Sequence, residues 1–142
     1  MNDVIPTEDS DDVKRSFGRC LLYQEKDKKF LDRFYEIFIS SHPAIKPVFE
    51  KTDFKTQIAA LKNGINMAIL HAKGDSLAAD VLSKIRKSHN RHHLNIKPEF
   101  YPYWVNSLIQ AIKESDPQFN DSLEKNWRSV LQFTVDYIKA AY

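Results

Sequence analysis

The apolar residues of this chain recur every three or four positions, which is the spacing of an α-helix and not the alternation of a β-strand. Five such stripes follow one another along the sequence. They consist of Leu31, Phe34, Tyr35 and Phe38; Ile58, Leu61, Ile65, Ala68, Ile69 and Ala72; Ala78, Val81, Leu82, Ile85 and His89; Tyr101, Trp104, Val105, Leu108 and Ile112; and Leu123, Trp127, Val130, Leu131, Thr134 and Ile138. The pattern predicts five helices between about residue 30 and the C-terminus.

Helix-breaking and capping residues fall between these stripes. Pro43 and Pro47 allow only a short helix after the first stripe. The tripeptide Gly-Asp-Ser at 74–76 ends one helix and offers caps for the next. The breaks therefore agree with the stripes.

Two further prolines mark the later helices. Pro98 and Pro117 stand where the first turn of a helix accepts proline, and Asp116 is a candidate cap beside the second of them. An additional helix is expected before the first stripe, from about Asp11 to Gln24. The predicted fold class is all-α, with six or seven helices.

Composition and charge narrow the class of protein. A chain of 142 residues fits one domain, and its hydrophobic share of 42% and charged share of 28% are ordinary for a soluble globular protein. The net charge of +2 is too small to argue by itself for a nucleic-acid partner. The single cysteine, Cys20, excludes an intramolecular disulfide framework and is typical of a reducing compartment; we assign it no role.

The first ten residues are predicted to form a leader that precedes the folded domain. The N-terminal sequence "MNDVIPTEDSDD" is acidic where a secretory signal is basic and then apolar. No run approaches the ~18 consecutive apolar residues of a membrane span. We therefore expect a cytoplasmic protein with no membrane partner, with a flexible acidic leader over residues 1–10 and a single domain over 11–142.

The stretch "SHNRHHLNIKPEFYPYW", residues 88–104, holds three of the five histidines. His89 lies about 30° from the centre of the apolar face of its helix, so its side chain is expected to point into the fold. His92 would lie equally close to that centre if the helix continued, and His93 only somewhat further away. His42 and His71 have no motif around them and are interpreted as helix-end or surface residues.

The residues themselves leave three interpretations of these histidines open. In the first, His89 is a core histidine bonded to a backbone carbonyl. In the second, His89 and His93 form a zinc pair, because they have the i, i+4 spacing of two zinc ligands. The third treats "KIRKSHNRHH" as a basic strip against nucleic-acid phosphates.

Three blocks in order resemble the globin family, in particular its bacterial single-domain branch. The block "FLDRFYEIF" (30–38) resembles the helix that supplies a distal aromatic residue. The block "VFEKTDFKTQIAAL" (48–61) resembles the corner phenylalanine and the distal helix. The stretch 88–104 resembles the proximal histidine, the loop after it and an aromatic-rich helix. The resemblance covers the chain from about residue 12 to the C-terminus and implies the globin fold around a haem b pocket.

On the proximal side the resemblance points to His89 as the ligand of the haem iron. The family pattern Ile-x-Pro-x-x-Tyr followed by an aromatic residue matches positions 96–104, although a longer interval leaves His92 or His93 as alternative ligands. The second ring nitrogen of His89 is expected to donate to the carbonyl of Ile85. Leu82, Ile85 and Tyr101 complete the proximal set. Tyr101 matches the tyrosine that supports the histidine in similar globins, whereas a matching glutamate is missing and Asp136 is poorly placed.

On the distal side the resemblance places Tyr35 and Gln57 over the iron, with Leu61 one turn beyond Gln57 and Phe49 as the corner residue that wedges the haem. A tyrosine hydroxyl and a glutamine amide can both donate to a gas ligand. A register shift by one or two would put Thr56 or Lys55 at the pocket instead.

The resemblance also implies partners and an activity. Arg91, His92 and His93 are candidates for the haem propionates. We expect tight binding of oxygen or another diatomic gas (nitric oxide or carbon monoxide), suited to oxygen scavenging, to nitric-oxide dioxygenation with a separate reductase, or to pseudo-peroxidase activity. The protein is expected as a monomer or homodimer without a nucleic-acid partner. The alternatives are a haem-free sensor or interaction module of globin fold and a helical nucleic-acid binder.

Overall fold

The computed structural model describes residues 5–22, 24–25, 28–89 and 97–140. Six α-helices lie within these residues, so the predicted all-α fold is confirmed. The elements are α1 (Thr7–Leu22), β1 (Gln24–Glu25), β2 (Lys28–Lys29), α2 (Phe30–Ser40), the 3-10 helix η1 (Lys46–Phe49), α3 (Phe54–Ala72), α4 (Ser76–His89), the 3-10 helix η2 (Pro98–Phe100), α5 (Tyr101–Ser115) and α6 (Asp121–Lys139). The two short strands pair antiparallel and were not predicted.

Local capping residues fix where α3, α4 and α6 begin. The Asp53 carboxylate accepts from the backbone N–H of Lys55, and the Asn120 side chain accepts from that of Leu123 at 2.8 Å. Before α4, the Asp75 carboxylate accepts from the backbone N–H of Leu77 and of the residue after it. Residue 74 adopts φ 88°, a conformation that suits glycine. The predicted break at 74–76 is confirmed.

The first helix begins earlier than predicted. It starts at Thr7 rather than near residue 11, and it ends at Leu22, so that Gln24 lies in β1. Glu8 and Asp9 lie in its first turn, where negative charge is favourable beside the unpaired N–H groups of a helix N-terminus. The acidity that we attributed to a solvated leader thus belongs in part to a helix start.

The prediction for Asp116 and Pro117 is wrong. Pro117 lies in a turn, and α6 begins four residues later with Asn120 as its cap. Asp116 instead follows the end of α5 as its C-terminal cap residue. Its carboxylate is occupied by side chains of α1, a contact across the fold that no local pattern indicates.

These contacts join α1 to the corner between α5 and α6. The Asp116 side chain is fully buried and accepts from Arg19 Nε at 2.7 Å and Nη2 at 2.9 Å. It also accepts from Ser16 Oγ at 2.6 Å and from the Gln118 N–H at 2.9 Å. Ser16 Oγ in turn accepts from Trp127 Nε1 at 2.9 Å. All the polar groups that the fold buries here have partners, as burial requires.

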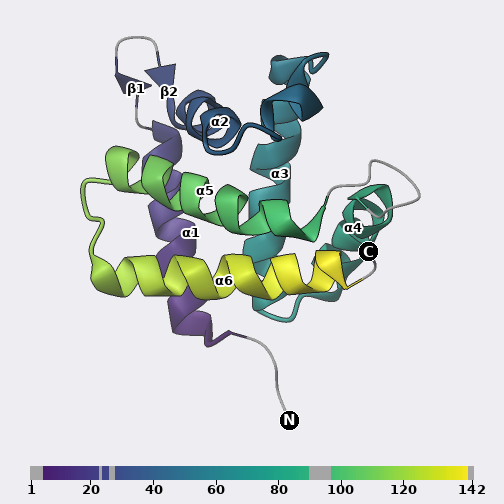
Figure 1. The fold of residues 1–142 in the computed structure, drawn as a ribbon. Helices are drawn as coiled ribbons and strands as arrows, with labels where there is room; N and C mark the ends of the chain where they lie inside the picture. Colours follow the sequence, from purple (N-terminus) through teal and green to yellow (C-terminus); the bar gives the residue numbers. More distant parts are fainter. Residues whose placement is uncertain (1–4, 23, 26–27, 90–96, 141–142) are drawn as a thin grey trace.

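The helices form two crossed groups. In Figure 1, α5 and α6 run side by side and cross α1 and α3, while α2 packs against α5. Aromatic residues fill the crossing, where Phe17 meets Phe30 and Trp127 edge to face, each with ring centroids 6.2 Å apart. The remaining helix, α4, packs against α3 and α6, and its buried residues are Ala78 and Leu82.

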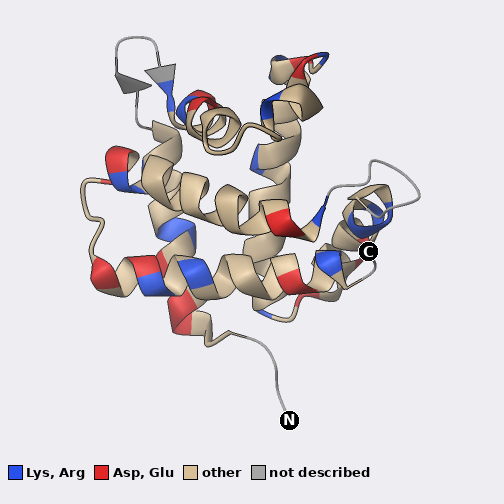
Figure 2. Ribbon diagram, viewed as in Figure 1, with Lys and Arg blue, Asp and Glu red and all other residues tan. Residues whose placement is uncertain are grey.

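Charged residues of both signs are spread over the outer faces of the helices (Figure 2). Along α6 residues of both signs occur, with Asp121 and Glu124 in the first turn and Lys139 in the last. Among the described residues, no helix is both long and apolar enough to cross a membrane. The basic residues of α4 do not form one exposed strip, because the guanidinium of Arg86 turns inward over the ring of Tyr137.

Candidate functional site

Tyr35 lies at the centre of an aromatic cluster formed by α2, η1 and the start of α3. Its side chain is 5% exposed. Its ring centroid lies 4.9 Å from Phe34, 5.8 Å from Phe49 and 5.4 Å from Phe54. Burial raises the pKa of Tyr35 to about 12, so its hydroxyl stays protonated near neutral pH and can act as a donor.

Gln57 is the polar residue of α3 that meets Tyr35. Its side chain is half-buried, and its hydrogen bond with the Tyr35 hydroxyl opposes the effect of burial on the pKa of that hydroxyl. Lys55 and Thr56 are exposed, and Thr56 Oγ1 donates to Asp53 at 2.9 Å. Among the three candidates for this position, Gln57 is therefore the one that α3 turns toward the tyrosine.

His89 is the last residue of α4 and is half-buried. Its Nδ1 lies 3.0 Å from Ser88 Oγ, and Ser88 Oγ lies 2.9 Å from the Ile85 carbonyl, to which it donates. Because the Ser88 proton goes to that carbonyl, the contact with His89 is satisfied when Nδ1 carries the ring proton. His89 also bonds the Ile85 carbonyl, as the sequence led us to expect.

Burial keeps the imidazole of His89 neutral. Removal from water lowers the pKa of His89 below its ordinary value of 6.5, and the hydrogen bond to Ile85 opposes this effect. With the proton on Nδ1, the lone pair of Nε2 is left available. A neutral imidazole with a free nitrogen is the form in which histidine binds a metal.

The other predicted proximal residues are apolar or aromatic, and of these only the backbone carbonyl of Ile85 takes part in the hydrogen bonds of His89 described above. Leu82 is buried and Ile85 is half-buried on α4. Tyr101 is buried at the start of α5, where burial raises its pKa to about 12. No hydrogen bond between Tyr101 and His89 is found among the described residues. Asp136 is 60% exposed and pairs with Lys139, so it gives His89 no carboxylate partner.

The structure brings the predicted residues together in two sets. Tyr35, Phe49 and Gln57 form one, and Leu61 packs half-buried against the core one turn further along α3. Ile85 and His89 form the other, on α4, which packs against α3. Within the described ranges, no hydrogen bond or ring contact joins the two sets. The predicted residues Arg91, His92, His93 and Ile96 lie outside the described residues.

Sequence reasoning missed two residues of these sets. Ser88 bonds both His89 and its carbonyl acceptor, and the only signal for it was its place directly before the histidine. Phe54 packs on Tyr35 and, with ring centroids 6.2 Å apart, on Phe49. It lies one helical turn before Gln57, which is the spacing that would have indicated it.

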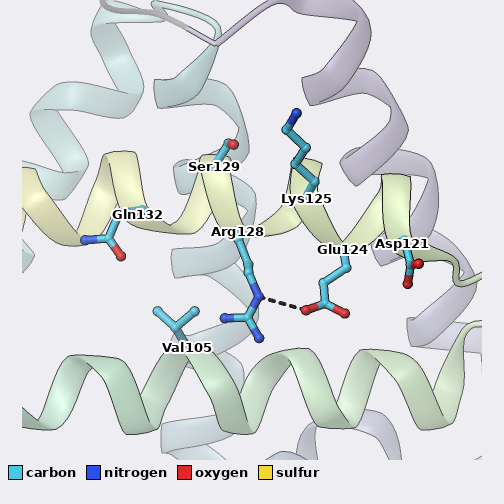
Figure 3. A pocket seen from close by; sticks show the side chains of 7 residues that line it. All are labelled: Val105, Asp121, Glu124, Lys125, Arg128, Ser129 and Gln132. Carbon is cyan, nitrogen blue, oxygen red and sulfur yellow. Dashed lines mark hydrogen bonds and ion pairs between the residues drawn. The ribbon is translucent and has the colours of Figure 1, made fainter.

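A surface hollow of about 570 Å³ lies elsewhere, over α5 and α6 (Figure 3). Arg128 reaches across it and donates to Glu124 and to Asn106, each at 2.9 Å. None of the predicted site residues lines it, and two of its charged side chains, Glu124 and Arg128, pair with each other. Its lining consists of Val105, Asp121, Glu124, Lys125, Arg128, Ser129 and Gln132.

Comparisons with known proteins agree on one family. The sequence profile described as Globin matches residues 32–138. A crystal structure of a Pseudomonas aeruginosa protein, described as structurally highly homologous to a human haemoglobin, superposes with a TM-score of 0.88 at 33% identity, covering 94% of this chain and 98% of that one.

Curated sequences give the same family at lower coverage. A flavohemoprotein of Bacillus cereus is 36% identical over 95 residues, which is 66% of this chain and 23% of that protein. An uncharacterised globin-like protein of Aquifex aeolicus is 31% identical over 93 residues, covering 66% of this chain and 65% of that protein. The chain thus spans about a quarter of the length of the flavohemoproteins it matches.

Proposed function

The chain belongs to the globin family, and from this premise we propose that it binds haem b through His89 and holds a diatomic gas beneath Tyr35 and Gln57. When bound, the haem would supply an iron able to bind a gas such as oxygen, nitric oxide or carbon monoxide. The side chains of this chain would hold the haem and donate hydrogen bonds to the gas.

The observation that carries this proposal is the hydrogen bonding of His89. Ser88 Oγ contacts Nδ1 and the Ile85 carbonyl also bonds the ring, and among the described residues no partner of Nε2 is found; a histidine ligand is oriented in this way by bonds to its other nitrogen. Leu82 and Ile85 provide apolar surface on the same helix. These residues fit a haem. Cys20 is the only cysteine and is buried, so the chain lacks the C-x-x-C-H pattern of covalent attachment; this favours haem b.

The distal residues favour tight binding of oxygen. The Tyr35 hydroxyl is protonated and buried, and the Gln57 amide lies within hydrogen-bonding reach of it. Both are donors toward a ligand that gains partial negative charge. In a water-poor aromatic surrounding, such hydrogen bonds slow the release of the ligand.

The proximal residues favour reversible binding over peroxidase chemistry. A carboxylate bonded to the histidine would increase electron donation to the iron, but Asp136 is exposed and paired elsewhere. The segment 90–96, Asn-Arg-His-His-Leu-Asn-Ile, contains no acidic residue. His89 therefore acts as a neutral imidazole. Nitric-oxide dioxygenation would also require a source of electrons.

The test is an absorption spectrum of the full chain reconstituted with haem b, ferric and then reduced. We expect a sharp Soret band that is lost in His89→Ala and restored by added imidazole, because the small molecule can replace the missing side chain. His42→Ala is the matched control, since His42 Nδ1 accepts only from the nearby backbone N–H of Ala44 and the band should persist.

Two outcomes contradict the proposal in different ways. A band that persists in His89→Ala moves the ligand to His92 or His93. No specific band in the wild-type protein means that the chain uses the globin fold without haem, as a sensor or interaction module.

A further inference from the structure

The last turn of α4 carries His89 but few of the contacts that hold the helix in place. The buried residues of α4, Ala78 and Leu82, lie in its first half. Residues 85–89 are half-buried or exposed. Contacts that these half-buried side chains make with other helices can therefore contribute to the position of the imidazole.

Arg86 makes such a contact with α6. Its guanidinium carbon lies 4.7 Å from the centroid of the Tyr137 ring. Within the described part of the chain, Arg86 Nε is buried and has no hydrogen-bond partner. Among the described residues, the Tyr137 ring is the group found over this guanidinium, and a cation–π contact is stronger where the cation is shielded from water.

Tyr137 is itself held in place from α3. Its ring centroid lies 5.1 Å from that of His71, which also packs on Phe133 at 4.8 Å and has its Nδ1 3.5 Å from Thr134 Oγ1. Burial lowers the pKa of His71, so the ring is neutral and places no second cation near Arg86. His71 lies in the last turn of α3, as the interpretation of it as a helix-end residue expected, and its ring also links α3 to α6.

We propose that Tyr137 is a positioning residue for His89, acting through Arg86. Arg86 and His89 are three residues apart and are therefore neighbours on one face of α4. The carbonyl that orients His89 belongs to Ile85, directly before Arg86. A displacement of α4 at Arg86 moves the imidazole and its acceptor together. This inference rests on the proposed function, in which His89 is the iron ligand.

The test compares Tyr137→Leu and Arg86→Gln with the wild-type chain, all reconstituted with haem b. Resonance Raman spectroscopy of the ferrous form measures the iron–histidine stretching band, which a merely structural role far from the ligand does not shift. We expect a shifted, broader band and about tenfold faster amide hydrogen exchange over residues 85–89, the scale of a desolvated cation–π contact.

Two matched controls keep the test specific. Tyr137→Phe retains the ring, and Lys84→Gln removes an exposed charge from the same helix, so both should behave as wild type. The double variant of Arg86 and Tyr137 should differ little from either single variant, because both remove one contact.

The inference is overturned if folded Tyr137→Leu keeps the wild-type band and exchange rates. If that variant does not fold, Arg86→Gln is compared with Lys84→Gln instead. A wild-type iron–histidine band and wild-type exchange rates in Arg86→Gln then overturn the inference. A wild-type protein without an iron–histidine band refutes the proposed function; the exchange rates over residues 85–89 then still show whether Tyr137 holds the end of α4.

Discussion

Replacing Asp116 by alanine should produce one of the largest losses of stability available in this chain. The carboxylate is fully buried, whereas Arg19 is 25% exposed. Alanine would leave the guanidinium without its partner, and it would remove the acceptor for Ser16 Oγ and for the Gln118 N–H. The donors of three residues, Arg19, Ser16 and Gln118, therefore lose their acceptor at once.

The size of the effect follows from burial. Removing one partner of a buried, hydrogen-bonded ion pair costs about 3–5 kcal/mol. For a chain of this length, that corresponds to a decrease in Tm of roughly 10–17 °C. Glu124→Ala is the matched control: it breaks the ion pair with Arg128, whose side chain is 42% exposed, and it should cost only ~0–1 kcal/mol.

Urea unfolding followed by circular dichroism measures both variants, and its pH dependence tests the cause. Burial alone would raise the pKa of Asp116, but hydrogen bonds from Arg19, Ser16 and the Gln118 N–H lower it below the ordinary 3.8. The carboxylate therefore stabilises the fold above about pH 4, and this contribution is lost as pH falls through the lower pKa of the folded state.

The difference between wild type and Asp116→Ala should accordingly shrink in acid. A loss below 1 kcal/mol at pH 7, no larger than that of Glu124→Ala, would refute the reasoning. So would a difference that does not decrease in acid.

Two further predictions concern the distal residues and the turn before α4. Tyr35→Phe and Gln57→Leu each remove one hydrogen-bond donor, so each should speed oxygen dissociation by up to about tenfold. A hydrogen bond contributes ~0.5–1.5 kcal/mol, and 1.4 kcal/mol is a factor of ten. Stopped-flow dissociation rates that are unchanged in both variants would contradict the distal assignment. Gly74→Ala should destabilise the protein by about 1–2 kcal/mol in urea unfolding, because residue 74 has φ 88°. Gly64→Ala, inside α3 with open space at its Cβ position, should instead stabilise by ~0.5–1 kcal/mol, and equal effects at the two glycines would contradict the backbone argument.

The helices were predictable from the sequence because their causes are local. The i, i+3, i+4 stripes fixed the helical period, and the glycine at 74 with Asp75 fixed the break before α4. Errors arose where one local pattern allows two structures. The acidic residues Glu8 and Asp9 are equally compatible with a flexible leader and with the first turn of a helix. Only the packing of α1 decides which of the two structures forms.

The candidate site was predictable in part. Tyr35, Gln57 and His89 followed from the resemblance, and the bond from His89 to the Ile85 carbonyl followed from helix geometry, because both residues lie on one helix. Ser88 was missed although it is the neighbour of the histidine. A serine near the end of a helix has many possible roles, and its contact depends on the side-chain conformation of His89.

The sequence by itself determined the helices and most of their breaks, since periodicity and capping act over a few residues, and the resemblance supplied the candidate iron ligand and the two candidate donors. Tertiary structure decided which distant residues meet. Asp116 pairs with Arg19, 97 positions away, and Arg86 finds the ring of Tyr137. Such partners are set by how α1, α4, α5 and α6 pack. The packing energy depends on the whole set of buried surfaces, so no short stretch of sequence specifies these pairs.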